Sequence, residues 1–266
     1  MGTLFLDHKN GKLAYDLAGS GPLVVCVPSM GDLRGEYRFL VPQLTDAGYR
    51  AVCVDVRGHG ESSNGWPDYS VAGIGSDLVA LIEQLDAGPA LIVGTSMAAG
   101  AGVWAAAEAP QRISGLALVG PFVRSAPNWT LDLLVKLMFA RPWGAATWLM
   151  YYAHLYPTHK PPDFPAYRAA LGKNLAEPGR LEALHAMLAA SKDASEERLP
   201  RVKAPVLVLM GSRDPDFKDP AAEAQWVAQS LHGRVEMVPD AGHYPHAEMP
   251  EKAGETILTF IKEVTP

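Results

Sequence analysis

Short apolar runs alternate along the chain with stretches in which apolar residues recur at helical spacing. The clearest runs lie at residues 23–27, 51–55, 90–93, 113–119, 206–210 and 235–238, and each gives way to a turn rich in Gly, Pro, Ser or Asp. Near-continuous apolar runs are typical of strands that helices cover on both faces. The alternation therefore predicts an α/β fold built on a mostly parallel sheet flanked by helices.

Two weaker strand candidates, residues 4–6 and 12–18, flank Asn10-Gly11, a dipeptide that favours a hairpin turn. They bring the predicted sheet to eight strands. Apolar spacing and the positions of Gly and Pro predict helices at residues 39–46, 74–85, 97–109, 221–231 and 251–264.

The alternation stops between residues 122 and 204, where prolines are frequent and no convincing strand occurs. Helical stretches are predicted there at residues 131–140, 145–154 and 181–191. A strandless segment of this length inside a regular alternation indicates an insertion rather than a loop. The predicted organisation is one core, residues 1–121 and 205–266, with a helical insertion at 122–204.

Composition narrows the class of protein. Of the 266 residues 48% are hydrophobic and 20% charged, and the net charge is −6 with no basic arm, so nucleic acid is not an expected partner. Cys26 and Cys53 sit inside apolar runs and are expected to be buried free thiols.

The N-terminus does not resemble a signal peptide, and the most membrane-like stretch, 142–153, is too short to span a bilayer. We expect a soluble, cytoplasmic protein; no pattern specifies an oligomeric state.

Candidate chemistry follows three of the predicted strands. Gly94-Thr95-Ser96-Met97-Ala98 joins an apolar run to a helix of small residues, as in a nucleophile elbow, with Ala98 at the last small position. Asp214 and His243 each follow a later strand. Because a serine hydroxyl needs a base beside it, and the base needs an acid to orient it, these three residues are a candidate triad. Carboxyl ends of parallel strands share one edge of a sheet, so the three should meet.

The sequence resembles the α/β-hydrolases over nearly its whole length. The resemblance rests on the motifs at 24–31, 55–62, 94–98, 211–214 and 242–250, in this order. It implies an α/β-hydrolase sheet with an inserted helical cap, Ser96 as nucleophile, Asp214 as acid and His243 as base. It also implies that the backbone N–H groups of Met97 and Met30 form the oxyanion hole. No cofactor and no metal are implied.

One feature departs from the family pattern. Many relatives have His-Gly before the donor residue of the oxyanion loop, and this chain has Pro28-Ser29. Ser29 therefore carries a Cβ where those relatives have none. This is the only feature that favours a non-catalytic, ligand-binding member of the family.

Several neighbouring residues have alternative interpretations. Asp214 could cap the next turn, with Asp216 or Asp219 as the acid. His59 is expected to brace the mouth of the site, and His246 to stabilise the loop that carries His243. Two further charged residues, Asp55 and Arg57, are expected to be scaffold.

The insertion is rich in aromatic residues. Most should form its own small core, and some should face the nucleophile; the candidates for the substrate pocket are Trp129, Phe139, Trp143, Trp148 and Tyr151. This predicts a small to medium-sized apolar substrate held mainly by burial. Arg124 could meet a substrate carboxylate, although a solvated surface arginine is the simpler interpretation.

The favoured function is a serine hydrolase that cleaves a carboxylic ester or lactone through an acyl-enzyme on the Ser96–His243–Asp214 triad. Relatives with this triad also hydrolyse carbon–carbon bonds of diketones or carry out cofactor-free perhydrolysis. A ligand-binding protein with the same fold is the alternative from another class.

Overall fold

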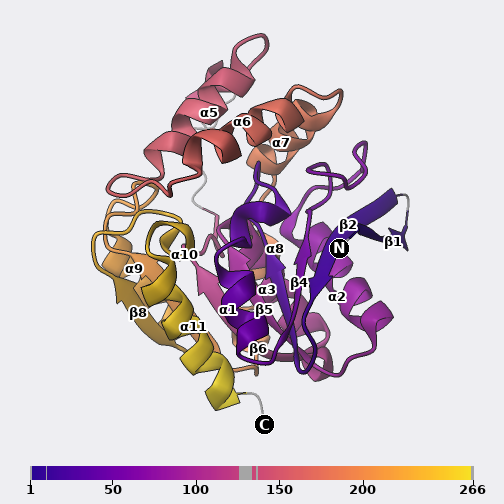
Figure 1. The fold of residues 1–266 in the computed structure, drawn as a ribbon, viewed down its shortest axis with the longest axis vertical. Coiled ribbons are helices and arrows are strands. Elements are labelled where there is room, and N and C mark those ends of the chain that lie inside the picture. Colours follow the sequence, from indigo (N-terminus) through magenta and orange to yellow (C-terminus); the bar gives the residue numbers. More distant parts are fainter. Residues whose placement is uncertain (1, 10, 126–133, 136, 265–266) are drawn as a thin grey trace.

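The eight predicted strands form a single sheet in the computed structural model, which describes residues 2–9, 11–125, 134–135 and 137–264 (Figure 1). Its order is β1-β2-β4-β3-β5-β6-β7-β8. The strands are β1 (Leu4–His8), β2 (Gly11–Ala18), β3 (Leu23–Val27), β4 (Arg50–Val54), β5 (Ala90–Thr95), β6 (Ile113–Val119), β7 (Val206–Gly211) and β8 (Arg234–Val238). Strand β2 pairs antiparallel with β1 and β4, and every other pairing is parallel. The prediction of a mostly parallel eight-stranded sheet is confirmed.

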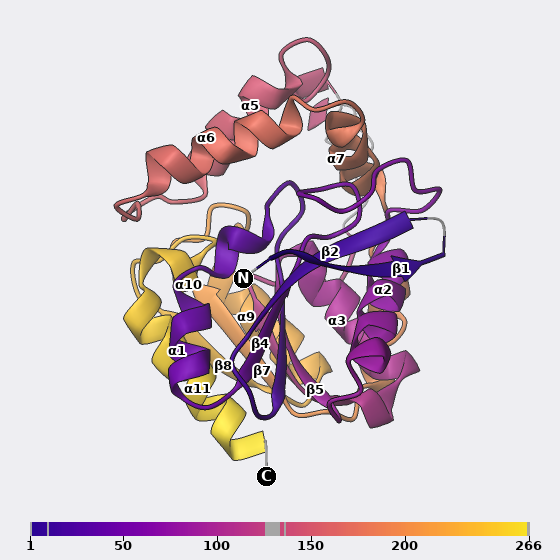
Figure 2. The same ribbon diagram turned by 45° about the vertical axis from the view of Figure 1, so that its right-hand side comes forward.

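Helices cover both faces of this sheet (Figures 1 and 2). One face packs against α1 (Leu40–Asp46) and α11 (Pro250–Val264). The other packs against α2 (Val71–Leu85), α3 (Met97–Glu108) and α9 (Pro220–Ser230). Cys26 and Cys53 are both buried and free, as the sequence predicted. The central strands β3, β5 and β7 are buried at every position, which explains their unbroken apolar sequence.

Residues 122–204, called the insert below, join β6 to β7. The described part of the insert contains α5 (Gly144–His154), α6 (Phe164–Leu175), α7 (Arg180–Ala189), α8 (Asp193–Glu196) and the 3-10 turn η3 (Leu199–Arg201). Figure 2 shows α5, α6 and α7 as a layer above one edge of the sheet. Within the described residues, the structure contains no helix with the length and apolar character needed to cross a membrane.

Helix α6 was not predicted from the sequence. Prolines are frequent in this part of the sequence, but Pro165 lies in the first turn of the helix, where a missing N–H costs no hydrogen bond. The expected helix at 131–140 lies partly outside the described residues.

A buried ion pair fixes the loop that follows β4. Arg57 donates to Asp77 of α2 from Nε at 2.7 Å and from Nη2 at 2.6 Å, and both side chains are almost fully buried. Arg57 also donates to the carbonyl oxygens of Asp68 and Gly73. The expectation that Arg57 is scaffold agrees with these contacts.

Replacing Arg57 with methionine is expected to lower the free energy of unfolding by about 3–5 kcal/mol, because Asp77 would remain buried without its main partner. Guanidinium unfolding curves measure the loss. The double variant Arg57→Met/Asp77→Leu should recover part of it, since no buried charge is then left unpaired. A loss below about 1 kcal/mol in the single variant would contradict this interpretation.

Candidate active site

Ser96 lies at a sharp bend between β5 and α3. Its φ of 58° and ψ of −122° lie in a region that serine rarely adopts, and such strain is common at functional sites. A Cβ on Gly94 would stand 2.8 Å from the carbonyl oxygen of Ala98, so residue 94 must be glycine. Two backbone bonds hold the bend: Ser96 N–H donates to Val119 O at 2.8 Å, and Phe122 N–H donates to Ser96 O at 3.1 Å. The elbow geometry thus follows from the small residues of the motif.

Asp214 and His243 form a buried pair beside this bend. His243 Nδ1 lies 2.7 Å from Asp214 Oδ2, and both side chains are buried. A Cβ on Gly120 would lie 3.0 Å from His243 Cε1 and 3.2 Å from Asp214 Oδ2. Gly120 directly follows Val119, whose carbonyl oxygen accepts a hydrogen bond from Ser96 N–H. Ser96, Asp214 and His243 therefore all lie around residues 119 and 120. Within the described residues Ser96 Oγ has no hydrogen bond to His243, a contact that often tightens only when substrate binds.

Their contacts with His243 distinguish the three candidates for the acid. Asp216 Oδ2 is 3.8 Å from His243 Nδ1, beyond hydrogen-bond distance, while its backbone N–H donates to Asp214 Oδ1 at 3.0 Å. Asp219 is exposed and caps α9 by accepting from Ala222 N–H. The contact with the imidazole therefore favours Asp214 as the acid.

The carboxylates around His243 make its imidazole a stronger base than a free histidine. Burial by itself lowers the pKa of His243, but the carboxylates of Asp214, Asp216 and Glu36 outweigh burial and raise this pKa to about 9. These carboxylates stabilise the protonated ring that forms when the base accepts a proton.

The loop after β3 presents the backbone N–H of Met30. Its neighbours are occupied: Ser29 N–H donates to Glu36 Oε2 at 2.8 Å, and Gly31 N–H donates to His59 Nε2 at 3.1 Å. Met30 N–H has no acceptor among the described residues. His59 braces the loop as expected, and burial lowers the pKa of His59 to about 4, which keeps the accepting nitrogen unprotonated.

The Pro28-Ser29 departure is accommodated by a local hydrogen bond. The Ser29 and Tyr244 hydroxyls lie 2.6 Å apart, and Ser29 is 2% exposed. The second candidate donor, Met97, is the first residue of α3, where N–H groups have no acceptor within the helix. Met97 is thus positioned by the start of α3, and Met30 by side chains that bond the residues on either side of it.

Sequence reasoning missed a buried acidic residue behind this loop. Glu36 belongs to the 3-10 turn η1 (Arg34–Tyr37), and its Oε1 lies 3.0 Å from His246 Nε2. Burial raises the pKa of Glu36 to about 7 and lowers the pKa of His246 to about 3. His246 belongs to α10 (Pro245–Glu248), and its ring stacks on Tyr37 at 4.9 Å, so His246 supports the segment after β3 as well as its own. No sequence signal distinguishes Glu36 from an ordinary surface glutamate.

Three of the predicted pocket residues meet near the site. Phe139, Trp148 and Tyr151 are in mutual ring contact with centroids 5.4–6.0 Å apart. Trp148 Nε1 donates to Gly31 O at 3.3 Å, and Tyr151 donates its hydroxyl proton to Asp216. These contacts attach α5 to the loop after β3 and to the loop after β7.

The remaining candidates of the insert lie elsewhere. Trp143 is 52% exposed and donates to Leu137 O. Trp129 lies outside the described residues. Arg124 pairs with Glu223 and stacks on Trp226 at 3.7 Å, so its guanidinium is already engaged.

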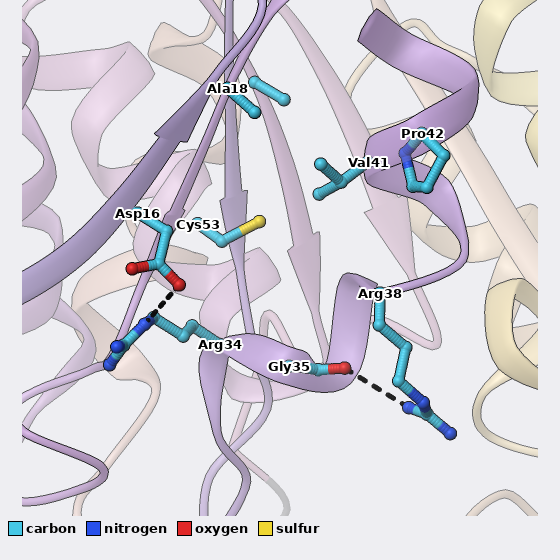
Figure 3. Close-up of a pocket in the computed structure, with 9 residues that line it drawn as sticks. Asp16, Ala18, Arg34, Gly35, Arg38, Val41, Pro42 and Cys53 are labelled. Atoms are coloured by element: carbon cyan, nitrogen blue, oxygen red, sulfur yellow. Dashed lines mark hydrogen bonds and ion pairs between the residues drawn. The ribbon is translucent and has the colours of Figure 1, made fainter. Parts of the chain in front are cut away.

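A surface pocket of about 250 Å³ lies away from these residues (Figure 3). It is formed by β2, β4, η1 and α1, and none of the candidate site residues lines it. Its arginines are already bonded, Arg34 to Asp16 and Arg38 to Gly35 O. We do not assign it to the candidate active site.

Comparison with known proteins agrees with this fold. The chain is 31% identical over 277 residues to a Mycobacterium tuberculosis protein, provisionally named as the non-heme bromoperoxidase BpoC, covering 95% of this chain and 98% of the relative. It is 26% identical to 3-oxoadipate enol-lactonase 2 of Acinetobacter baylyi, covering 80% and 79%. The structure matches an esterase from Exiguobacterium antarcticum with a TM-score of 0.84 at 21% identity, covering 98% of this chain and all of the other. The family model for the alpha/beta hydrolase fold matches residues 22–250, and the chain therefore belongs to the alpha/beta hydrolase family.

Proposed function

We propose that this hydrolase cleaves carboxylic esters or lactones of small to medium apolar compounds, with Ser96 as the nucleophile. The observation that carries the proposal is the buried Asp214–His243 pair at 2.7 Å beside the strained turn of Ser96. The relatives named as lactonase and esterase support the reaction class. The geometry of the elbow supports an active nucleophile over a ligand-binding role.

The proposed reaction has two halves. His243 Nε2 accepts the Ser96 Oγ proton as the oxygen attacks the carbonyl carbon, and Asp214 holds Nδ1 so that the other nitrogen is free to accept. The negative oxygen that develops accepts hydrogen bonds from Met30 and Met97 N–H. The carbon–oxygen bond of the ester breaks, and the leaving alcohol takes the proton from His243. Water then gives a proton to His243 and its hydroxide to the acyl carbon. The bond from that carbon to Oγ breaks, the carboxylic acid leaves, and Ser96 Oγ takes the proton back from His243.

We propose that the insert acts as a cap over the nucleophile. The supporting contacts run from Trp148 and Tyr151 of α5 to the two loops beside the site. The aromatic contacts of Phe139 with both rings favour apolar substrates, because an aromatic surface binds mainly by burial.

A fluorophosphonate probe tests the proposal directly. The probe forms a covalent bond to an activated serine, so rapid labelling located at Ser96 by peptide mass spectrometry is the expected result. A panel of p-nitrophenyl esters of increasing chain length, with lactones and a diketone, then defines the bond that is cleaved. Folded protein that does not label would favour the ligand-binding alternative.

Activity is expected to rise with pH up to about 9. Because the carboxylates around His243 raise its pKa to about 9, the imidazole of the free enzyme is mostly protonated at neutral pH and cannot accept the Ser96 proton. The value of kcat/KM should therefore increase about tenfold per pH unit on the acid side and level off near the pKa. Initial rates with p-nitrophenyl butyrate, corrected for spontaneous hydrolysis, measure this profile. A plateau already reached near pH 6.5 would contradict it.

A further inference from the structure

Asp216 is a second carboxylate beside the candidate base, and the mechanism above does not use it. Its Oδ2 lies 3.8 Å from His243 Nδ1, and its side chain is 12% exposed. Tyr151 of α5 donates its hydroxyl proton to Oδ1. The loop after β7 therefore carries two acidic groups, Asp214 in hydrogen-bond contact with the imidazole and Asp216 held beside it by the insert.

Tyr151 is a suitable partner for a negatively charged Asp216. Burial and the adjacent carboxylate raise the pKa of Tyr151, so its hydroxyl remains a proton donor. A neutral donor stabilises a carboxylate without cancelling its charge. The negative charge of Asp216 therefore acts on the candidate site and is not neutralised by an ion pair with any Lys or Arg of the described residues.

The other groups around the site add negative charge. His243 is faced by Asp214 and Asp216 from the loop after β7 and by Glu36 from η1. Asp216 is faced by His243, by Asp214 and Tyr151, and by His154 at the exposed end of α5. Arg124, the candidate partner for a substrate carboxylate, is bonded to Glu223. The largest charged influences on His243 are these three carboxylates.

We propose that Asp216, held by Tyr151, is a positioning and selectivity residue that directs the site to esters with an uncharged acyl group and disfavours anionic ones. The inference rests on the proposed function, because it assumes that His243 is the base. A carboxylate on an acyl chain bound beside His243 would be repelled by Asp216, whose side chain is partly buried, because like charges repel more strongly there than in water. The same charge stabilises the imidazolium form of His243.

Two matched esters test the selectivity. p-Nitrophenyl butyrate and mono-p-nitrophenyl succinate share a four-carbon acyl chain and differ in a terminal carboxylate. In Asp216→Asn the ratio of kcat/KM for the neutral over the anionic ester should fall about tenfold relative to the unmodified chain. Tyr151→Phe keeps the ring and removes the donor, so it should move the ratio in the same direction by a smaller factor. Asp219→Asn removes one charge from the same loop and should leave the ratio unchanged, since Asp219 is exposed and caps α9.

The pH profile provides a readout that a purely structural role would not change. Loss of the Asp216 charge destabilises the protonated imidazole, so the acid limb of the butyrate profile should move to lower pH by about one unit in Asp216→Asn. At pH 7 this variant should hydrolyse the neutral ester faster than the unmodified chain does. The double variant Asp216→Asn/Tyr151→Phe should resemble Asp216→Asn, because Tyr151 acts through that carboxylate.

A titration of His243 by NMR separates failure of this inference from failure of the proposed function. The measurement needs no turnover, and a lower His243 pKa in Asp216→Asn is the expected result. If the ester ratio and the His243 pKa are both unchanged in Asp216→Asn while Ser96 still labels with fluorophosphonate, the role of Asp216 is refuted and the triad stands. If Ser96 does not label while the His243 pKa still falls, the proposed function is refuted and the electrostatic contact stands.

Discussion

Replacing Ser96 with alanine is expected to lower kcat/KM for p-nitrophenyl butyrate by about 10⁵-fold or more, leaving only the residual catalysis that binding and the oxyanion donors provide. The acyl-enzyme cannot form without Oγ, and the remaining residues can only bind and polarise the ester. Because Ser96 lies at a strained turn whose backbone bonds do not involve Oγ, the variant should fold normally. Steady-state rates, fluorophosphonate labelling and thermal unfolding should be measured on the same preparation.

The matched control is Ser20→Ala, which removes a hydroxyl from an exposed loop before β3. It should retain full activity and full labelling. If Ser96→Ala kept more than a tenth of the activity, Ser96 would not be the nucleophile, and the observed hydrolysis would need another serine or a direct attack by water.

The fold could be predicted from the sequence because its signals are local. The run at 23–27 is apolar at every position because β3 is covered on both faces, and the elbow needs Gly94 because Ala98 O stands 2.8 Å from its missing Cβ. Asp214 and His243 could be paired from the sequence because parallel strands bring their carboxyl ends to one edge. In these cases the type of residue indicates the structural environment in which it lies.

The missed features depend on contacts between distant segments. Tyr151 reaches Asp216 across 65 positions, and nothing in either neighbourhood specifies the other. Ser29 is tolerated in the loop after β3 because Tyr244, 215 residues away, shares a hydrogen bond with its hydroxyl. Glu36 was missed for the same reason, since its burial depends on His246 and the loop that carries it. Such pairings require the packed structure.

Replacing Asp214 with asparagine is expected to lower kcat by about 10⁴-fold while leaving KM nearly unchanged. The amide has the same shape, and its oxygen should remain the acceptor of the Asp216 N–H, as Asp214 Oδ1 is at 3.0 Å, which turns its NH₂ group toward His243 Nδ1. An NH₂ group cannot accept the proton of Nδ1, so the imidazole loses the hydrogen bond that orients it and the charge that stabilises its protonated form. Asp216 should not replace Asp214, because it is 3.8 Å from Nδ1 and its other oxygen is bonded to Tyr151.

The double variant Asp214→Asn/Asp216→Asn tests whether Asp216 takes over the role of Asp214. A loss of kcat beyond that of the single variant would equal the contribution of Asp216. Asp219→Asn is the matched control and should keep full activity, because its amide oxygen can still cap α9. Suppose that Asp214→Asn kept more than a tenth of kcat and the double variant did not. Asp216 would then be the functional acid in the single variant, and either carboxylate could orient the imidazole that Asp214 contacts at 2.7 Å. If both variants stayed active, the base would not depend on an acid, and the triad assignment would fail although the fold remained.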